Sequence, residues 1–381
     1  MTTIGRLSDF CKVIAGQSPK GSSYNKNGKG IEFHQGKKAF GKEVIEPSGV
    51  WTTEITKVAE AGDILMSVRA PVGPTNFTDR KVCIGRGLAA IRCSTKVLPQ
   101  YILYSLRSIQ DKIVGKDGAV FNSINKEMIE NLPVPSLSLA EQQRIVDILD
   151  EAFEKIDALK ANAEQNLQDA KALFQSALKE ILCVDNGKTY TLQDVCTDYG
   201  EYGMSVPSKA FDGTRYLRIT DITEWGDLNN ELVSADVDVV DEHYILKDGD
   251  ILFARTGATV GKTLVYDSSF GRCSYAGYLI RYRPNQTIVL PRMLYYITHS
   301  SKYYAWVLSN QKKSTLPNIS AKLYNAYKLT LPPIAEQKDI IARLDDLNDR
   351  CKALQTNYDK TLTLCDDLKQ ALLRKAFNGE L

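Results

Sequence analysis

The sequence predicts an α+β protein in which a globular lobe followed by a long helix occurs twice. Two observations lead to this fold class. Short motifs recur at an offset that grows from 185 to 195 residues along the chain, as in Leu7–Cys11 with Leu192–Cys196 and Leu139–Gln142 with Ile334–Gln337. Each copy also begins with short apolar runs rich in Gly and Tyr and ends with a long stretch of helical periodicity. We therefore predict a duplicated unit whose two copies are related by an approximate two-fold axis.

Prolines mark the change from lobe to helix, because proline disfavours helix before itself and suits a helix start. They stand at 133 and 135 in the first copy and at 332 and 333 in the second. Within the lobes, runs such as Ile251–Ala254 predict strands. The predicted domains are a first lobe at 1–136, a spacer helix at 137–183, a second lobe at 184–331 and a second spacer helix at 332–381.

The apolar residues of both helical segments alternate in steps of three and four, which predicts a coiled coil. Chain order favours an antiparallel pair that separates the lobes, because a parallel pair would require the second lobe to stretch the whole way back along the first helix. One observation favours the opposite direction, because an in-register parallel pair would set Asn166 beside Thr361 as a polar layer. A helix lying on a globular core is the alternative, because Phe153, Phe174 and Leu178 widen the apolar stripe. The predicted seam consists of Ile145, Leu149, Ile156, Leu159, Leu173, Ile340, Leu344, Leu347, Leu354, Leu368 and Leu372.

The composition argues against a secreted, membrane or metal-binding protein. The chain has no run of 18 apolar residues and does not start like a signal peptide, so a cytoplasmic location is expected. Its eight cysteines form no C-x-x-C pair and its three histidines are far apart, so we expect reduced thiols and no metal site.

Charge is unevenly distributed although the net charge is only +2. Residues 1–136 hold 19 Lys and Arg against 12 Asp and Glu; residues 184–250 hold 5 against 15, and residues 251–331 hold 11 against 1. One end of the second lobe should therefore be positive and suit nucleic acid. The expected sources are Arg255, Lys262, Arg272, Arg281, Arg283, Lys312 and Lys313.

Basic residues interleaved with Tyr, Asn and Gln suit a DNA surface, because cations bind phosphates while Arg, Asn and Gln bind base edges. Ordinary solvated strand residues are the alternative for any single position. The predicted DNA contacts are Tyr24, Asn25, Gln35, Lys37, Lys38, Arg69 and Arg86 in the first lobe, and Arg255, Lys262, Tyr275, Lys312 and Lys313 in the second.

The stretch Arg255–Thr263 resembles a phosphate-binding loop but is one residue short of the G-x-x-x-x-G-K-[ST] pattern. Its counterpart Ser67–Gly73 keeps an arginine and the last glycine but has Pro74 where Lys262 stands. H-E-x-x-H and G-x-S-x-G motifs are missing as well. We therefore expect no catalytic residues and no enzyme activity.

Several stretches of the chain together match one known family. They are Gly16–Asn25, Gln35–Lys37, Ser67–Gly73, Cys83–Ala89, Gly249–Phe253, Arg255–Ala258, Leu279–Arg283, the two Ala-Glu-Gln helices and Ala376–Leu381. Through these stretches the chain resembles the specificity subunit of type I restriction-modification systems. The resemblance implies a non-catalytic subunit whose two target recognition domains each read half of a bipartite DNA target. It implies partners too: two methylation subunits docked by the helices, and restriction subunits; S-adenosylmethionine, ATP and Mg would belong to those partners.

Two other functions remain open at this point, a coiled-coil assembly protein whose lobes bind proteins and a nucleotide hydrolase. Salt-sensitive, sequence-specific DNA binding separates the first from DNA recognition. If the helices set the distance between half-sites, four residues inserted after Glu164 should add about 6 Å, close to two base pairs.

Overall fold

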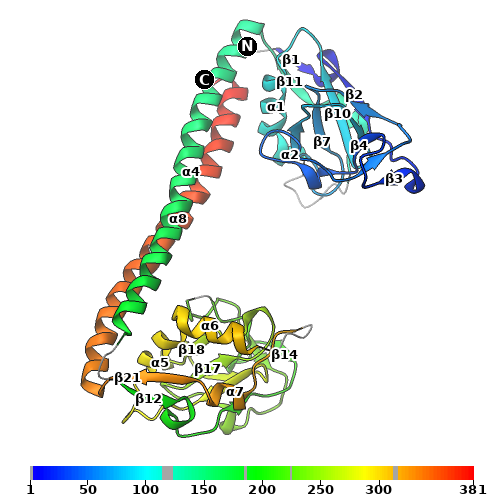
Figure 1. Cartoon of the computed structure of the whole chain (residues 1–381). Coiled ribbons are helices and arrows are strands. Elements are labelled where there is room, and N and C mark those ends of the chain that lie inside the picture. Colours follow the sequence, from blue (N-terminus) through cyan, green and yellow to red (C-terminus); the bar gives the residue numbers. More distant parts are fainter. Residues whose placement is uncertain (1–2, 114–122, 184–186, 224, 312–315) are drawn as a thin grey trace. The chain divides into compact units, whose positions relative to one another are not determined.

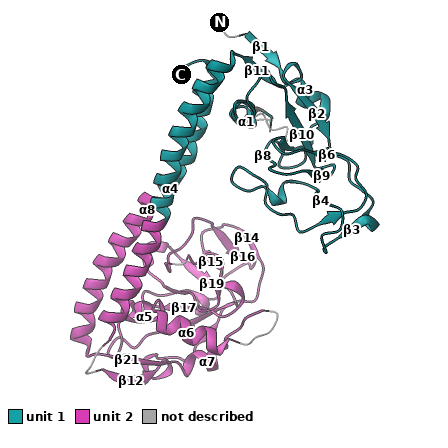
Figure 2. Ribbon diagram, turned by 45° about the horizontal axis from the view of Figure 1, so that its top comes forward, with its two compact units in different colours: residues 1–164, 359–381 teal, residues 165–358 magenta. Residues whose placement is uncertain are grey.

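The computed structural model describes residues 3–113, 123–183, 187–223, 225–311 and 316–381 (Figure 1). Each lobe lies in one of two compact units, and both long helices pass from one unit into the other (Figure 2). Unit 1 holds residues 1–164 and 359–381, and unit 2 holds residues 165–358. The two β-rich lobes and paired helices confirm the predicted α+β class.

The lobe of unit 1 contains two main sheets. A four-stranded antiparallel sheet has the order β2-β10-β7-β8, a five-stranded mixed sheet has the order β3-β5-β4-β9-β6, and β1 pairs with β11 where the lobe joins its helix. The strands are β1 (Thr3–Arg6), β2 (Cys11–Ala15), β3 (Tyr24–Asn25), β4 (Ile31–His34), β5 (Trp51–Thr52), β6 (Val58–Ala59), β7 (Ile64–Ser67), β8 (Thr75–Phe77), β9 (Val82–Ile84), β10 (Leu88–Cys93) and β11 (Pro133–Ser136). The short helices are α1 (Pro99–Ser108), α2 (Gln110–Ile113) and α3 (Lys126–Glu130).

The lobe of unit 2 repeats this plan. Its four-stranded sheet has the order β13-β20-β17-β18, β12 pairs with β21, β15 runs parallel to β19, and β14 pairs with β16. The strands are β12 (Lys188–Thr191), β13 (Glu201–Tyr202), β14 (Ser208–Ala210), β15 (Arg215–Leu217), β16 (Val233–Ala235), β17 (Ile251–Ala254), β18 (Thr263–Val265), β19 (Cys273–Tyr275), β20 (Leu279–Tyr282) and β21 (Lys328–Leu331). The short helices are α5 (Pro291–Thr298), α6 (Ser301–Asn310) and α7 (Ala321–Asn325).

The long helices α4 (Leu139–Ile181) and α8 (Ile334–Asn378) run antiparallel within each unit. In unit 1, Asp157 pairs with Lys369 and Lys160 pairs with Asp366, so the α8 partner moves back by three as the α4 residue advances by three. In unit 2 the Cys351 thiol contacts the Ala170 carbonyl. This confirms the expected direction of pairing.

The strict heptad seam is wrong in the middle of both helices. Leu159, Leu173, Leu354 and Leu368 are 57, 63, 42 and 48% exposed, whereas Phe174, next to Leu173, is buried. The seam positions Leu347 and Leu372 are half-buried. Ile145, Leu149, Ile156, Ile340 and Leu344 are buried as expected. An α-helix of 3.6 residues per turn drifts away from a 3.5-residue repeat, and each helix end also packs on a lobe. The buried stripe therefore shifts by one position, and Phe174 and Leu178 join the core of the second lobe.

Gln142 of the first Ala-Glu-Gln motif fixes α4 to its lobe. The side chain is 1% exposed; its oxygen accepts from the Leu98 N–H at 2.9 Å, and its nitrogen donates to the carbonyls of Leu137 at 2.9 Å and Lys96 at 3.4 Å. A buried amide with its hydrogen-bonding groups paired fixes helix and lobe in one arrangement.

Gln337 repeats this arrangement in unit 2. Its oxygen accepts from the Leu290 N–H at 2.9 Å, and its nitrogen donates to the carbonyls of Ile288 and Pro332, both at 2.9 Å. The recurring motif in the sequence is therefore the joint between a lobe and the helix that follows it.

Candidate nucleic-acid interface

Four loops of the first lobe meet where its strands end. They follow β2, β4, β7 and β9, and backbone hydrogen bonds tie them together. The Gln17 N–H donates to the Ile84 carbonyl at 3.0 Å, the Gly87 N–H to the Gln35 carbonyl at 3.2 Å, and the Val68 N–H to the Gly87 carbonyl at 3.0 Å. The motifs Gly16–Asn25, Gln35–Lys37, Ser67–Gly73 and Cys83–Ala89, distant in sequence, thus form one surface.

Gln35 lies at the centre of these loops. The Ser18 hydroxyl donates to its side-chain oxygen at 2.9 Å, and the same hydroxyl accepts the Arg86 N–H at 3.2 Å. A Cβ at Gly85 would lie 2.6 Å from the Gln35 side-chain oxygen, and one at Gly87 would lie 2.5 Å from its carbonyl oxygen. The glycines on both sides of Arg86 are therefore required by close packing, and they present the arginine at the tip of the turn.

Lys37, Lys38, Arg69 and Arg86 are exposed on this surface, and none forms an ion pair with a carboxylate of the described residues. Some cations elsewhere in the same lobe are paired, as Arg92 is with Asp63 at 2.7 Å. Unpaired cations leave a positive field that attracts phosphates.

Tyr24 and Asn25 lie beside the four loops and have structural contacts. Tyr24 is 37% exposed, stacks on Phe33 at 4.9 Å between ring centroids, and donates to the Pro19 carbonyl at 3.0 Å. Asn25 closes a turn through two hydrogen bonds with Lys29, of 2.8 and 3.0 Å. Both residues support the loop that enters the surface.

His34 lies buried next to Gln35. Burial lowers its pKa, opposed by the nearby carboxylate of Glu32, so the ring is neutral at pH 7. The hydrogen bond from Arg80 and the Ser48 N–H lower the pKa of Glu32 despite the opposing effect of its burial. The positive charge of the surface therefore comes from the lysines and arginines alone.

In the second lobe, Arg255 follows β17 and its guanidinium lies over the Tyr202 ring, 4.7 Å from the centroid. Its backbone N–H donates to the Tyr278 carbonyl at 3.0 Å, as that of Val68 does to Gly87. Arg255 thus takes the place of Val68, and the expected match between Arg69 and Arg255 is off by one residue. Tyr278 is 61% exposed here.

Tyr202 and Ser18 were missed at the sequence level. Ser18 stands inside the motif Gly16–Asn25, so its place in the loop could have been noticed. Tyr202 lies 53 positions before Arg255, and only the pairing of β13 with β20 beside β17 brings the two together.

Two expectations for the second lobe need correction. Tyr275 is fully buried, with Arg281 over its ring at 5.2 Å, and belongs to the core rather than to a DNA surface. The expected positive end is weakened, because three of the four sheets of the lobe pair strands of its acidic half with strands of its basic half. Ion pairs neutralise three of its expected sources: Arg272 with Glu242, Arg281 with Glu201, and Arg283 with Asp198.

Three further predicted contacts have different outcomes. Lys262 remains half-buried with its ammonium 3.4 Å from the Ile222 carbonyl. Lys312 and Lys313 lie outside the described residues.

The loop Arg255–Thr263 does not have the structure of a nucleotide-binding loop. A single 3-10 turn spans Gly257–Thr259, and the strand β18 begins at Thr263 where a phosphate-binding loop would begin a helix. Within the described parts of the chain, no three His, Cys, Asp or Glu residues group as a metal site would require, and no helix has the length and apolar character needed to cross a membrane.

Comparison with known proteins gives a consistent result. The profile of the family described as type I restriction modification DNA specificity domain matches residues 2–168 and 175–364. A protein of Methanocaldococcus jannaschii, named provisionally as the MjaX specificity subunit, is 41% identical over 173 residues, which is 44% of this chain and 40% of that protein. The StySPI specificity subunit of Salmonella potsdam is 25% identical over 319 residues, 78% of this chain and 68% of the other.

Two solved structures share the fold. A chain from a study of complex assembly and conformational transition of the type I R-M system matches with a TM-score of 0.78 at 21% identity, covering 100% of this chain and 98% of that one. The HsdS subunit from Thermoanaerobacter tengcongensis matches with a TM-score of 0.52 at 20% identity, covering 100% and 97%.

Proposed function

The chain belongs to the type I restriction-modification DNA specificity family, and on that premise we propose that each lobe reads one half of a bipartite target in double-stranded DNA. Members of this family are the non-catalytic specificity subunits of their complexes. The observation that supports the proposal is the surface of four loops in the first lobe, where Lys37, Lys38, Arg69 and Arg86 are exposed and pair with no carboxylate of the described residues.

We assign the residues of this surface to two kinds of contact. Lys37 and Lys38 suit phosphates, whereas Gln35 and Arg86, which stand on a rigid glycine-packed turn, suit base edges. In the second lobe, Arg255 stacked on Tyr202 and the exposed Tyr278 take the corresponding place. Tyr24 and Asn25 act by supporting the loop.

The partners follow from the same premise. Two methylation subunits dock on the paired helices and bring S-adenosylmethionine, and restriction subunits bring ATP and Mg. The helices set the unspecified gap between the half-sites. The complex works in the cytoplasm, where it meets chromosomal and incoming DNA.

Selection from a pool of random duplexes tests the proposal directly. The chain is purified with its methylation subunit, and bound duplexes are sequenced after several rounds at moderate salt. A motif of two short blocks separated by an unspecified gap is the expected product. Enrichment without any motif, or no retention of DNA, would refute the proposal and favour a coiled-coil assembly protein.

A further inference from the structure

Two cysteines of the first lobe lie directly opposite each other on neighbouring strands. Cys11 begins β2 and Cys93 ends β10, and the two residues are Cα partners in the antiparallel ladder of these strands. They stand 82 positions apart in the sequence, yet the Cys11 thiol donates to the Cys93 sulfur at 3.6 Å. Both thiols are free. The fold therefore brings two reduced thiols from distant parts of the chain into contact.

The place of this pair in the ladder suits a disulfide bond. The Ser94 N–H donates to the Phe10 carbonyl at 2.9 Å, so Phe10 and Ser94 form a hydrogen-bonded pair and the next pair, Cys11 with Cys93, is a non-hydrogen-bonded one. Opposite Cα atoms of such pairs are about 4.5 Å apart and their side chains lie close together. Disulfides span Cα separations of about 4.4 to 6.8 Å. A bond between the two sulfurs therefore needs no change in the register of the strands.

The second lobe lacks this pair, although it repeats the first cysteine. Cys196 takes the place of Cys11, but it is bridged to Pro284. Other thiols of the chain contact oxygen atoms, as Cys83, Cys273 and Cys351 do. The facing thiols are thus an addition to the duplicated fold rather than a part of its repeated plan.

The two thiols differ in their access to solvent. Cys11 is 7% exposed whereas Cys93 is half-buried, so an oxidant in solution reaches Cys93 first. The hydrogen bond to Cys93, together with burial, raises the pKa of Cys11, so Cys11 keeps its proton until Cys93 has reacted. An accessible thiol with a second thiol behind it is the usual arrangement in reversible thiol oxidation.

We propose that Cys11 and Cys93 form a modification site at which a peroxide closes a reversible disulfide between β2 and β10. The Cys93 sulfur attacks one oxygen of hydrogen peroxide, the O–O bond breaks, and Cys93 becomes a sulfenic acid while its proton leaves in a first water. The Cys11 sulfur then attacks the Cys93 sulfur, the S–O bond breaks, and a second water leaves with the Cys11 proton. Two thiols are thereby oxidised by two electrons, and one peroxide is reduced to two waters. A small thiol reverses the step by thiol–disulfide exchange and is itself oxidised to its disulfide.

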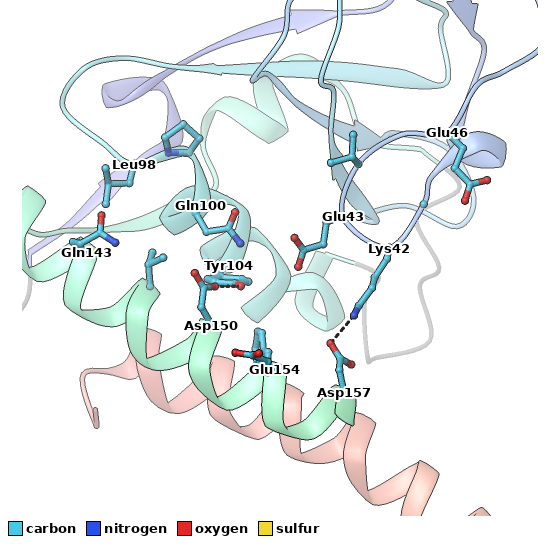
Figure 3. A pocket seen from close by; sticks show the side chains of 15 residues that line it. Lys42, Glu43, Glu46, Leu98, Gln100, Tyr104, Gln143, Asp150, Glu154 and Asp157 are labelled. Carbon is cyan, nitrogen blue, oxygen red and sulfur yellow. Dashed lines mark hydrogen bonds and ion pairs between the residues drawn. The ribbon is translucent and has the colours of Figure 1, made fainter. Parts of the chain in front are cut away.

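The bond would enclose the segment that carries the loop surface. The loops after β2, β4, β7 and β9 all lie between Cys11 and Cys93 in the sequence. The two sulfurs lie at the opposite ends of β2 and β10 from these loops, four residues or about 14 Å along each strand. Beyond Cys93 the chain reaches Leu98, which bonds to Gln142 and lines a groove with Gln143 of α4 (Figure 3). Oxidation should therefore stabilise the lobe at its joint with α4 and leave the loops in place.

Peptide mapping of the full chain tests the site. The reduced chain is treated with hydrogen peroxide, the remaining thiols are alkylated, and the digest is analysed by mass spectrometry. We expect a linked pair of peptides that contains Cys11 and Cys93, lighter than the separate peptides by two hydrogen atoms, and recovery of both thiols after treatment with a small thiol. Cys93→Ala should abolish the link, whereas Cys183→Ala, which removes an exposed thiol elsewhere, should preserve it. Alkylation of both cysteines after peroxide, or oxidation of Cys93 to a sulfinic acid without a link, would overturn the inference.

Thermal unfolding and selection of DNA measure the effect of the bond. The oxidised chain should unfold at a midpoint about 5 to 10 °C above that of the reduced chain, whereas Cys93→Ala should unfold at the same midpoint under both conditions. The selected DNA motif should be the same in both redox states. An oxidised chain that unfolds no higher than the reduced one would overturn the stabilising role. Because the link is read from mass alone, a chain that retains no DNA would refute the proposed function without changing the result for the disulfide.

Discussion

Gln142 and Gln337 show how a single side chain determines the arrangement of a lobe on its helix. Each is almost fully buried and bonds to three backbone groups of the chain segments around the helix start. Tyr104 and Tyr296 add a second repeated link, since their hydroxyls donate to Asp150 and Asp345 of the long helices. Polar links of this kind specify one arrangement where apolar packing alone would allow several.

We expect Gln142→Leu to lower the free energy of unfolding by about 2 to 4 kcal/mol, because it leaves the Leu98 N–H and two carbonyls buried without partners. Chemical denaturation measures the loss, and hydrogen exchange should place it at the start of α4. Gln143→Leu, an exposed neighbour, should change the free energy by less than about 0.5 kcal/mol. Equal effects of the two substitutions would show that the buried hydrogen bonds contribute little.

Arg86 and Arg69 offer a test of the loop surface. Replacing either by Ala should weaken DNA binding and reduce the slope of log affinity against log salt by about 1 if the side chain meets phosphate. If Arg86 reads a base edge, its loss should instead cost about 1 to 3 kcal/mol for the specific sequence only. Lys81→Ala is the control, because Lys81 pairs with Glu60 away from the loops. Fluorescence anisotropy over a salt series, with specific and unspecific duplexes, distinguishes these outcomes, and unchanged binding by both arginine variants would contradict the assignment.

His299 makes the stability of unit 2 depend on pH. The ring is buried, its Nδ1 lies 2.8 Å from the Tyr295 carbonyl, and burial lowers its pKa to about 4. The unfolded chain therefore binds a proton between about pH 6.5 and pH 4 that the native state does not, and its stabilising contribution falls as pH falls through this window. Burial raises the pKa of Asp250 to about 6, and that group contributes with the opposite sign.

Comparison of the unaltered chain with His299→Asn isolates the histidine. The unaltered chain should lose about 3 kcal/mol relative to the variant between pH 7 and pH 4, on the order of the pKa shift converted at 1.36 kcal/mol per unit. Urea denaturation at a series of pH values measures the difference. A difference that stays constant with pH would contradict the assignment to His299.

At the scale of elements, the two long helices show which features the sequence could predict. Their existence, length and antiparallel direction followed from apolar periodicity and chain order. The middle of the seam did not, because a strict 3.5-residue repeat ignores both the drift of a straight helix and the side chains such as Phe174 that pack on a lobe. The buried Asn348 within the seam shows the same limit, since nothing in the local pattern marks a polar residue as buried.

The loop surface of the first lobe could be predicted only in part from the sequence. Gly16, Gly85 and Gly87 mark places where loops approach closely, and the basic residues stand next to them. Charge counted along the chain was misleading in the second lobe, because β13 with β20 and β15 with β19 bring acidic and basic segments together. Burial of Tyr275 likewise depends on a parallel strand pair that no local motif reveals.

Helix length should set the gap between half-sites. The pair Lys160–Asp366 places Glu164 opposite Leu362, so a heptad added after Glu164 and another after Thr361 preserve the pairing. Each adds about 10 Å, and the gap should grow by about three base pairs. Mapping of methylated sites measures the gap; an unchanged gap would contradict the role of the helices as spacer. The insertion of four residues after Glu164, in α4 alone, is still expected to lengthen the gap. It disturbs the helix pairing more than the two matched heptads do.

At the scale of the molecule, the duplication connects these observations. The same glutamine and the same tyrosine–aspartate link occur in both copies, whereas the sequences of the loops that follow the strands differ between the copies. Identical contacts between lobe and helix, combined with different loops, are expected of two domains that recognise different half-sites. The predicted domain limits at 136, 183 and 331 stay a prediction, because the compact units divide the long helices near their middles.

A genome-wide map of N6-methyladenine tests the central claim most directly. The chain is expressed with its methylation subunit in a host without other methylation, first unaltered and then with residues 184–331 replaced by the corresponding lobe of a relative. The account predicts a split motif in which the exchange alters one half and leaves the other half and the gap unchanged. Methylation at the same sites without the chain, or a motif whose two halves both change, would contradict it.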